Sequence, residues 1–200
     1  MTGLRLPNFH GYRALIVHVD DRNRALLAEH LQKLGLRTQA CWPAERLAPD
    51  VADLILFDAD MGFDDLFGWE PGHAQVPLIA LLGSEAPGRI EWALSQAPSA
   101  FLTKPIRSNG VFSALAIAFH TFAAQREQRR LIENLNLRIK ARPLVLRAIL
   151  MLMRERKLND TDAFHMLRAE SMKRRVSVEE LCQQLVARAG RQAPEYRTKG

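Results

Sequence analysis

The sequence predicts an α/β fold: a five-stranded doubly wound parallel sheet, followed by a long coiled-coil helix and a small all-α bundle of three helices. Three observations support this prediction. Short apolar runs alternate with helix-like stretches over residues 1–122, the later sequence is helical in pattern, and charge divides at the same place. Residues 1–122 hold 10 Lys and Arg against 13 Asp and Glu, whereas residues 123–200 hold 18 against 9. The second part is therefore strongly basic, which indicates a polyanionic partner.

The composition excludes several classes of protein. Apolar residues make up 48% and charged residues 25% of the 200 residues, which is ordinary for a globular chain and excludes wholesale disorder. No apolar run approaches the roughly 20 residues that span a bilayer, and the N-terminus lacks a signal-peptide pattern. Two distant cysteines, Cys41 and Cys182, favour reduced thiols over a disulfide or zinc site. We expect a cytoplasmic protein without a membrane partner.

The predicted strands are short apolar runs, each closed by a turn or a charged residue. They are expected at residues 12–19, 36–40, 53–57, 77–82 and 100–103. Leucines at helical spacing predict a helix over 24–34, which Gly35 ends, and a second helix is expected near 90–96. Strands that alternate with helices imply a parallel sheet with crossover connections.

The later part predicts a long helix over residues 111–142. Its apolar residues recur three and four positions apart, at Phe112, Leu115, Phe119 and Phe122 and then at Ile132, Leu135, Ile139, Leu146, Ile149 and Met153. Such spacing with charged flanks favours a dimeric coiled coil. Pro143 is expected to break or restart the helix. Caps at Asn159 or Asp160 and at Ser177 predict two more helices, the last ending at Gly190.

Charged residues follow three of the predicted strands. Asp20 and Asp21 end the first strand, Asp58 the third and Lys104 the fifth, and the ends of parallel strands meet at one edge of the sheet. Three carboxylates suit Mg²⁺, whose charge offsets their mutual repulsion. Asp58 is then a candidate phosphoryl acceptor, with Lys104 neutralising the phosphate. The other acidic residues nearby are expected to be ordinary loop charges: Asp50, Asp60, Asp64 and Asp65.

Four segments resemble the receiver domain of two-component response regulators: LIVHVDD at 15–21, LILFDADM at 54–61, PLIAL at 77–81 and FLTKPI at 101–106. The resemblance implies that Asp20, Asp21 and Asp58 hold Mg²⁺, that Asp58 is the phospho-acceptor and that Lys104 contacts the phosphate. Leu82 stands where the family usually carries a Thr or Ser hydroxyl for the phosphoryl group. A working phosphorylation site and a degenerate pseudo-receiver therefore both stay open.

Basic residues concentrate in the predicted helices after residue 143. The candidates for phosphate contacts with a nucleic acid are Arg147, Arg154, Arg156, Lys157, Arg168, Lys173, Arg174 and Arg175. Residues 148–185 resemble the ANTAR domain, an RNA-binding output module, through the run AF-x-x-LR-x-x-SM at 163–172. Phe164 within this run is expected to belong to the core. The chain departs from the family at 148–150, where Ala-Ile-Leu replaces the common Ala-Lys-Gly.

Together these resemblances place the chain close to the AmiR/NasT group of regulators. The QACWP segment at 39–43 and the SMKRR run at 171–175 are similar to the AmiR branch of that group. The organisation implied is a receiver-like domain at 1–110, a coiled-coil dimerisation helix at 111–142, an ANTAR-like three-helix RNA-binding domain at 143–190 and a tail at 191–200.

The group resemblance implies a transcription antitermination regulator that binds tandem stem-loops in a leader transcript as a homodimer. Its receiver would be controlled by phosphorylation from a histidine kinase or by an AmiC-like ligand-binding regulator. The alternative is a DNA-binding response regulator, although the connection near Asn159 is not an obvious helix-turn-helix turn. A protein whose coiled coil is its only output would leave the basic charge incidental. An enzyme has least support, since no P-loop, dinucleotide motif or nucleophile–base set is visible.

Overall fold

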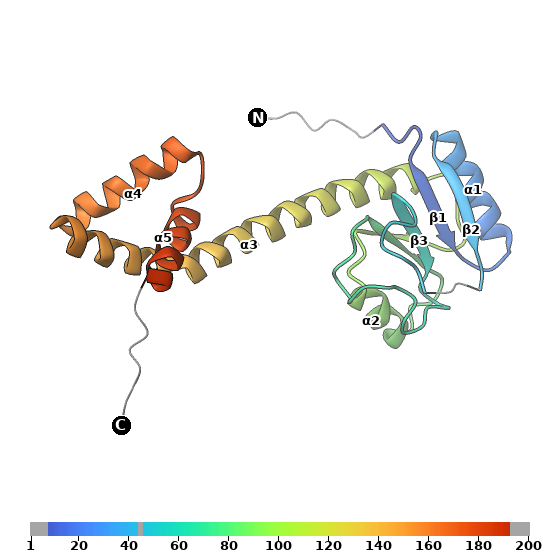
Figure 1. Ribbon diagram of the computed structural model, residues 1–200. Helices are drawn as coiled ribbons and strands as arrows, with labels where there is room; N and C mark the ends of the chain where they lie inside the picture. The colour runs from blue at the N-terminus through green and yellow to red at the C-terminus, as the bar shows by residue number, and fades with distance from the viewer. Residues whose placement is uncertain (1–7, 44–45, 193–200) are drawn as a thin grey trace, which may run out of the picture. The chain divides into compact units, whose positions relative to one another are not determined.

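The structure is a computed structural model that describes residues 8–43 and 46–192 (Figure 1). Two compact units make up the chain, Met1–Glu127 and Gln128–Gly200. No helix among the described residues combines the length and the apolar character that a bilayer crossing needs.

The first unit is built on a parallel sheet. Its strands are β1 (Arg13–Val17), β2 (Arg37–Cys41), β3 (Leu54–Asp58), β4 (Leu78–Leu82) and β5 (Ala100–Thr103), in the spatial order β2-β1-β3-β4-β5. The neighbours β2, β1 and β3 are labelled in Figure 1. Every neighbouring pair is parallel. The central strand β3 is buried along its whole length, as its apolar sequence requires in a sheet covered on both faces. The predicted five-stranded doubly wound sheet is confirmed, and its strand order reverses direction between β1 and β3.

Helices cover one face of the sheet. The helix α1 (Arg22–Lys33) and the beginning of α3 (Val111–Arg156) pack on this face. Leu27 and Leu31 of α1 and Leu115 of α3 are fully buried against apolar side chains of β1, β3 and β4. The 3.6-residue spacing of these leucines explains why one side of each helix faces the sheet.

Loops and aromatic side chains cover much of the other face. The helix α2 (Pro87–Ser95) lies here, but the described residues of the β2–β3 and β3–β4 connections form no helix. The ring of Phe57 instead contacts Phe67 from a loop and Trp92 from α2, with ring centroids 5.3 and 5.8 Å apart. The chain passes so close to Trp92 at Gly62 that an added Cβ would lie 2.0 Å from the indole ring. Large rings thus replace the usual crossover helices in closing this face.

The second unit consists of the later part of α3 with α4 (Asp160–Arg174) and α5 (Val178–Gln192). Its core is a cluster of buried residues, Ala148, Leu167, Leu181 and Cys182. The predicted caps are present: Asn159 Oδ1 accepts the N–H of Asp162 at 2.7 Å, and Ser177 Oγ accepts the N–H of Glu180 at 3.1 Å. These caps satisfy amide groups that the first turns of both helices leave unpaired.

The expectation that Pro143 breaks or restarts the helix is wrong. The helix α3 continues from Val111 to Arg156 with Pro143 inside it. A proline removes one N–H donor and leaves the carbonyl of Ile139 without its helical partner. Both residues are exposed, so water can satisfy that carbonyl. The predicted three-helix bundle is therefore the end of α3 with α4 and α5.

The last predicted boundary is also displaced. The helix α5 continues past Gly190 to Gln192. From residue 193 on, the predicted tail lies outside the described residues.

Candidate functional site

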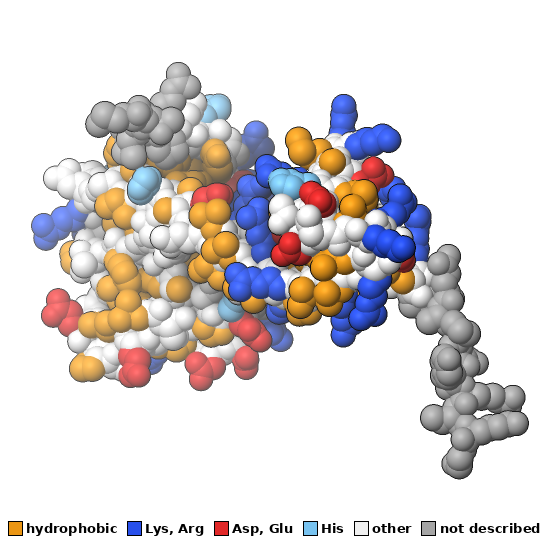
Figure 2. All heavy atoms as spheres, turned by 90° about the vertical axis from the view of Figure 1, so that its left-hand side faces the viewer, with side chains coloured by type: hydrophobic (Ala, Val, Ile, Leu, Met, Phe, Trp, Pro, Cys, Tyr) orange, Lys and Arg blue, Asp and Glu red, His pale blue; other side chains and the backbone are white. Residues whose placement is uncertain are grey.

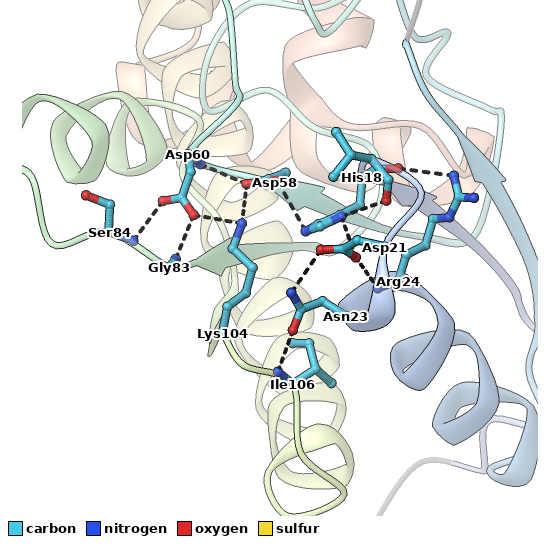
Figure 3. A network of polar contacts seen from close by, with 11 residues as sticks. His18, Asp21, Asn23, Arg24, Asp58, Asp60, Gly83, Ser84, Lys104 and Ile106 are labelled. Atoms are coloured by element: carbon cyan, nitrogen blue, oxygen red, sulfur yellow. Dashed lines mark hydrogen bonds and ion pairs between the residues drawn. The ribbon is translucent and has the colours of Figure 1, made fainter.

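A buried histidine lies at the carboxyl end of β1. His18 follows the last residue of the strand and is 1% exposed. Its Nε2 lies 3.1 Å from Oδ2 of Asp58, and its Nδ1 lies 3.0 Å from the carbonyl oxygen of Val19 and 3.4 Å from Oδ1 of Asp21 (Figure 3). The imidazole therefore stands between two carboxylates. Sequence analysis missed His18, although a histidine in an apolar run, with one residue between it and two acids, was an available signal.

The carboxylate of Asp58 has neighbours at both oxygen atoms. This residue ends β3 and is 3% exposed. Oδ1 accepts a hydrogen bond from Nζ of Lys104 at 2.8 Å and another from the N–H of Asp60 at 2.9 Å, while Oδ2 faces His18. The parallel sheet thus brings the carboxyl ends of β1 and β3 side by side, and the long side chain of Lys104, directly after β5, reaches Asp58 past the intervening strand β4.

Asp20 and Asp21 lie at the start of α1 instead of at the end of β1. Asp21 is the N-cap of that helix: its carboxylate accepts the N–H of Arg24 at 2.9 Å and Nδ2 of Asn23 at 3.0 Å. Burial acts to raise the pKa of Asp21, but these hydrogen bonds and the nearby imidazole outweigh it and lower the pKa. Asp20 pairs with Arg24, and its side chain is 86% exposed. The sequence prediction placed both residues about two positions too close to the strand.

The predicted magnesium ligands are consequently not gathered around one point. The imidazole of His18 separates Asp21 from Asp58, and Asp20 is turned to solvent and Arg24. Across the described ranges 8–43 and 46–192, no three His, Cys, Asp or Glu side chains are grouped to hold a metal ion. This arrangement of side chains does not fit magnesium. Magnesium binding stays a prediction, and it would require the imidazole of His18 to move out from between Asp21 and Asp58.

Asp60 is a member of this pocket, and the expectation that it is an ordinary loop charge is wrong. Its Oδ2 lies 2.7 Å from Nζ of Lys104 and accepts the N–H of Gly83 at 2.8 Å, while Oδ1 accepts the N–H of Ser84 at 3.0 Å (Figure 3). Burial acts to raise the pKa of Asp60, yet Lys104 and the two amides hold it below its ordinary value. Burial likewise acts to lower the pKa of Lys104, but its bonds to Asp58 and Asp60 raise it.

Neither residue near the end of β4 supplies a hydroxyl to Asp58. Leu82 ends the strand with an apolar side chain. The hydroxyl of Ser84 accepts the N–H of Ala86 at 3.2 Å, at the start of α2. The polar contacts of this loop to the pocket therefore run through its backbone amides.

The second candidate site is the basic surface of the helical unit. All eight predicted RNA contacts are exposed: Arg147, Arg154, Arg156, Lys157, Arg168, Lys173, Arg174 and Arg175. Figure 2 shows Lys and Arg side chains over the exposed surface of this unit. Among these eight described residues, Arg174 alone has an ion pair, with Glu170 at 2.5 Å. The remaining guanidinium and ammonium groups are available to phosphates.

Apolar side chains stand beside these charges on α4. Phe164 and Met172 are 40% and 71% exposed, and Arg168 lies midway between them at i, i+4 spacing, so the three share one helical face. The prediction that Phe164 belongs to the core is wrong, because Ala163 and Leu167 supply the buried side of α4. An exposed ring next to an exposed guanidinium is a group that can stack on an unpaired base.

Comparison with known proteins relates both sites to families. A family model described as "AmiR, N-terminal" matches residues 12–119, and one described as "ANTAR domain" matches residues 133–186. No curated protein matches the chain.

Solved structures give a likeness in fold. The response regulator StyR is 14% identical with a TM-score of 0.50, over 87% of this chain and 100% of that one. The signal receiver domain of a modulated diguanylate cyclase from Desulfovibrio desulfuricans G20 is 17% identical with a TM-score of 0.45, over 57% and 98% of the two chains.

Proposed function

The chain belongs to the family described as "AmiR, N-terminal" and carries an ANTAR domain after it, and from this premise we propose an RNA-binding transcription antitermination regulator. The observation that carries the proposal is the ANTAR match over 133–186, which includes all eight exposed cations. A regulator of this kind holds a leader transcript in a form that cannot make the terminator hairpin.

The contacts with RNA follow from the surface of the helical unit. Phosphate binding needs several cations that are free of carboxylate partners, and the unit presents them on α3, on α4 and at both ends of α4. Phosphate contacts alone do not distinguish one RNA from another. We assign discrimination to the face of Phe164, Arg168 and Met172, which offers an aromatic ring and a guanidinium plane to the bases of a loop.

Homodimerisation would use the exposed apolar stripe of α3. Ile132, Leu135, Ile139 and Leu146 are each more than half exposed, at coiled-coil spacing. A second copy of the helix would remove these side chains from water. The dimer would gain about 25 cal/mol of free energy for each Å² of apolar surface buried. Such a dimer carries two ANTAR domains, which matches two stem-loops in tandem.

Two routes of control are compatible with the family. A histidine kinase would phosphorylate Asp58, whereas an AmiC-like ligand-binding regulator would bind the receiver-like unit directly. The geometry favours the second route, because Lys104 and the N–H of Asp60 already donate to Oδ1 of Asp58 and the imidazole of His18 stands 3.1 Å from Oδ2. Leu82 also supplies no hydroxyl for a phosphoryl group.

The experiment is a titration of the full chain with an RNA that carries two short hairpins, the same RNA with scrambled loops, and a DNA duplex of equal length. Each is measured at two salt concentrations, since binding through phosphates alone weakens steeply with salt. We expect a preference for the intact loops that persists at the higher salt concentration. Equal, salt-sensitive binding to all three would instead support a simple polyanion surface, and a preference for the duplex would support a DNA-binding regulator.

Matched variants make the result specific to the ANTAR domain. Replacing Lys173 and Arg175 with Gln removes two charges inside the matched range, and replacing Arg126 and Arg130 removes two exposed charges before it. Replacing Lys173 and Arg175 should weaken RNA binding and lower its salt dependence. Replacing Arg126 and Arg130 should change both quantities only slightly. Equal effects would assign binding to net charge alone.

A further inference from the structure

Three donors converge at the ends of β4 and β5. The ammonium group of Lys104 and the backbone N–H groups of Gly83 and Ser84 all point to the carboxylate of Asp60, at 2.7 to 3.0 Å (Figure 3). One charged donor with two consecutive amides is a donor set suited to a small oxyanion. The anion that occupies it belongs to the chain itself.

Gly83 permits this close approach. A Cβ at this position would lie 2.6 Å from Oδ2 of Asp60 and 2.9 Å from Cε of Lys104. Real Cβ atoms are not found at such distances, so any other residue would push the carboxylate and the lysine stem aside. The backbone of the loop is therefore shaped around the carboxylate of Asp60.

The imidazole of His18 fills the side of Asp58 that faces away from Lys104 and Asp60. Nε2 of His18 lies 3.1 Å from Oδ2 of Asp58 but makes no aligned hydrogen bond. The imidazole thus occupies the place at the end of β1 from which a cation would approach that oxygen. The N–H of Asp60 donates to Oδ1 of Asp58, so the backbone of the same residue joins both halves of the pocket.

We propose that Asp60 is a built-in anion that fills an oxyanion site formed by Lys104, Gly83 and Ser84 and so holds the β4–α2 loop in its bound arrangement. The loop is then fixed without any phosphoryl group, and removal of the carboxylate opens a site for inorganic phosphate. This proposal goes beyond the antitermination function, because it concerns the receiver-like unit alone and does not depend on RNA binding.

The test measures hydrogen exchange of the amides of residues 83–86 in the full chain. The proteins compared are the unsubstituted chain, Asp60→Ala and the control Asp64→Ala. The control removes an exposed carboxylate from the β3–β4 connection, which also contains Asp60. In Asp60→Ala we expect the amides of Gly83 and Ser84 to exchange about tenfold faster or more, since each loses a charged acceptor. Inorganic phosphate, compared with chloride at equal ionic strength, should restore slow exchange in this variant only.

A further variant identifies the site at which phosphate acts. Any phosphate that the basic helical unit attracts does not affect this readout, since exchange at Gly83 and Ser84 reports on the pocket alone. Adding Lys104→Met to Asp60→Ala should abolish the response to phosphate. Unchanged exchange in Asp60→Ala would overturn the role of Asp60, and faster exchange that phosphate does not reverse would overturn the oxyanion site. Should Asp60→Ala not fold, Asp60→Asn is measured in its place, with the same direction expected and the same two contrary outcomes.

Discussion

Nε2 of His18 lies 3.1 Å from Oδ2 of Asp58, and both side chains are almost fully buried. The two residues follow and end adjacent parallel strands, so the sheet itself sets their separation. Lys104 neutralises one side of the buried carboxylate, and the imidazole shields the other side from the apolar interior. A buried carboxylate needs such partners, because an uncompensated charge is strongly destabilising.

Replacement of His18 by alanine should therefore destabilise the receiver-like unit. The variant leaves a cavity and removes one of the groups beside Asp58, so we expect a loss of about 2–4 kcal/mol in the free energy of unfolding. Urea denaturation of this unit measures the loss. His73→Ala, which removes an exposed imidazole, is the control and should change stability by less than about 0.5 kcal/mol. Equal effects from the two variants would show that the buried contact contributes nothing.

Replacement of His18 by aspartate should create a response to magnesium. Two carboxylates would then face each other at the ends of β1 and β3, and their repulsion would lower the stability of the variant without metal. Mg²⁺ binds such oxygen pairs and stabilises the folded state by mass action. We expect the thermal midpoint of His18→Asp to be higher in buffer with Mg²⁺ than in the same buffer without it. The midpoint of the unsubstituted chain should change much less. A strong magnesium response of the unsubstituted chain would contradict this account of His18.

The contribution of Asp53 to the stability of the receiver-like unit should depend on pH. Its carboxylate forms an ion pair with Arg13 at 3.1 Å and accepts the N–H of that residue at 2.9 Å. The hydrogen bonds from Arg13 hold the pKa of Asp53 below its ordinary value. A lowered pKa in the folded state means that the contribution is complete above the unfolded pKa and is lost as pH falls through the folded pKa.

Asp53→Asn should consequently lower stability at pH 7 but much less in acid. The side chains of this pair are more than one-third exposed, so water screens the pair and the expected loss is about 0.5–1 kcal/mol. Urea denaturation at pH 7 and near the acid limit of folding measures both values, with the exposed Asp64→Asn as control. The same loss at both pH values would exclude the ion pair as its cause.

The sequence was sufficient for most of the fold because periodicity records burial. The buried strand β3 and the leucines of α1 follow directly from apolar spacing. The continuity of α3 through Pro143 could not be predicted from a local rule, since it depends on whether solvent can reach the backbone around Ile139, an exposed residue. The covering of one sheet face by Trp92 and loop aromatics depends on long-range packing that no short pattern records.

The pocket was predicted less well than the fold for a related reason. Asp58 ends β3 and Lys104 follows β5, so the carboxyl edge of the parallel sheet places both side chains at the same end of the sheet, where Lys104 reaches Asp58 past β4. Asp21 was expected at the end of the first strand, although an acid followed three residues later by a helical pattern is equally an N-cap. His18 and Asp60 carry no motif of their own, and their roles depend on which donors the tertiary fold aims at them.

The coiled-coil proposal predicts opposite results for two leucines of α3. Leu135 belongs to the exposed stripe with Ile132 and Ile139, whereas Leu137 lies about 200° further round the helix. Both are more than half exposed, so neither substitution should unfold the single chain. Leu135→Glu should convert the dimer to a monomer, and Leu137→Glu should leave it intact, as sedimentation equilibrium would report. Dissociation by both variants, or by neither, would argue against this stripe as the interface.

Phe164 and Met166 provide a matched pair for RNA recognition, because both lie on α4 and each is 40% exposed. Phe164 shares a face with Arg168, whereas Met166 lies on another side of the helix. If a loop base stacks on the ring, Phe164→Ala should weaken binding to the paired hairpins by about 1–3 kcal/mol for each stacked base. Binding to the scrambled loops should change little, since phosphate contacts remain, and Met166→Ala should leave both affinities nearly unchanged. Equal weakening of both RNAs by Phe164→Ala would mean that the ring supports the helix surface without reading a base.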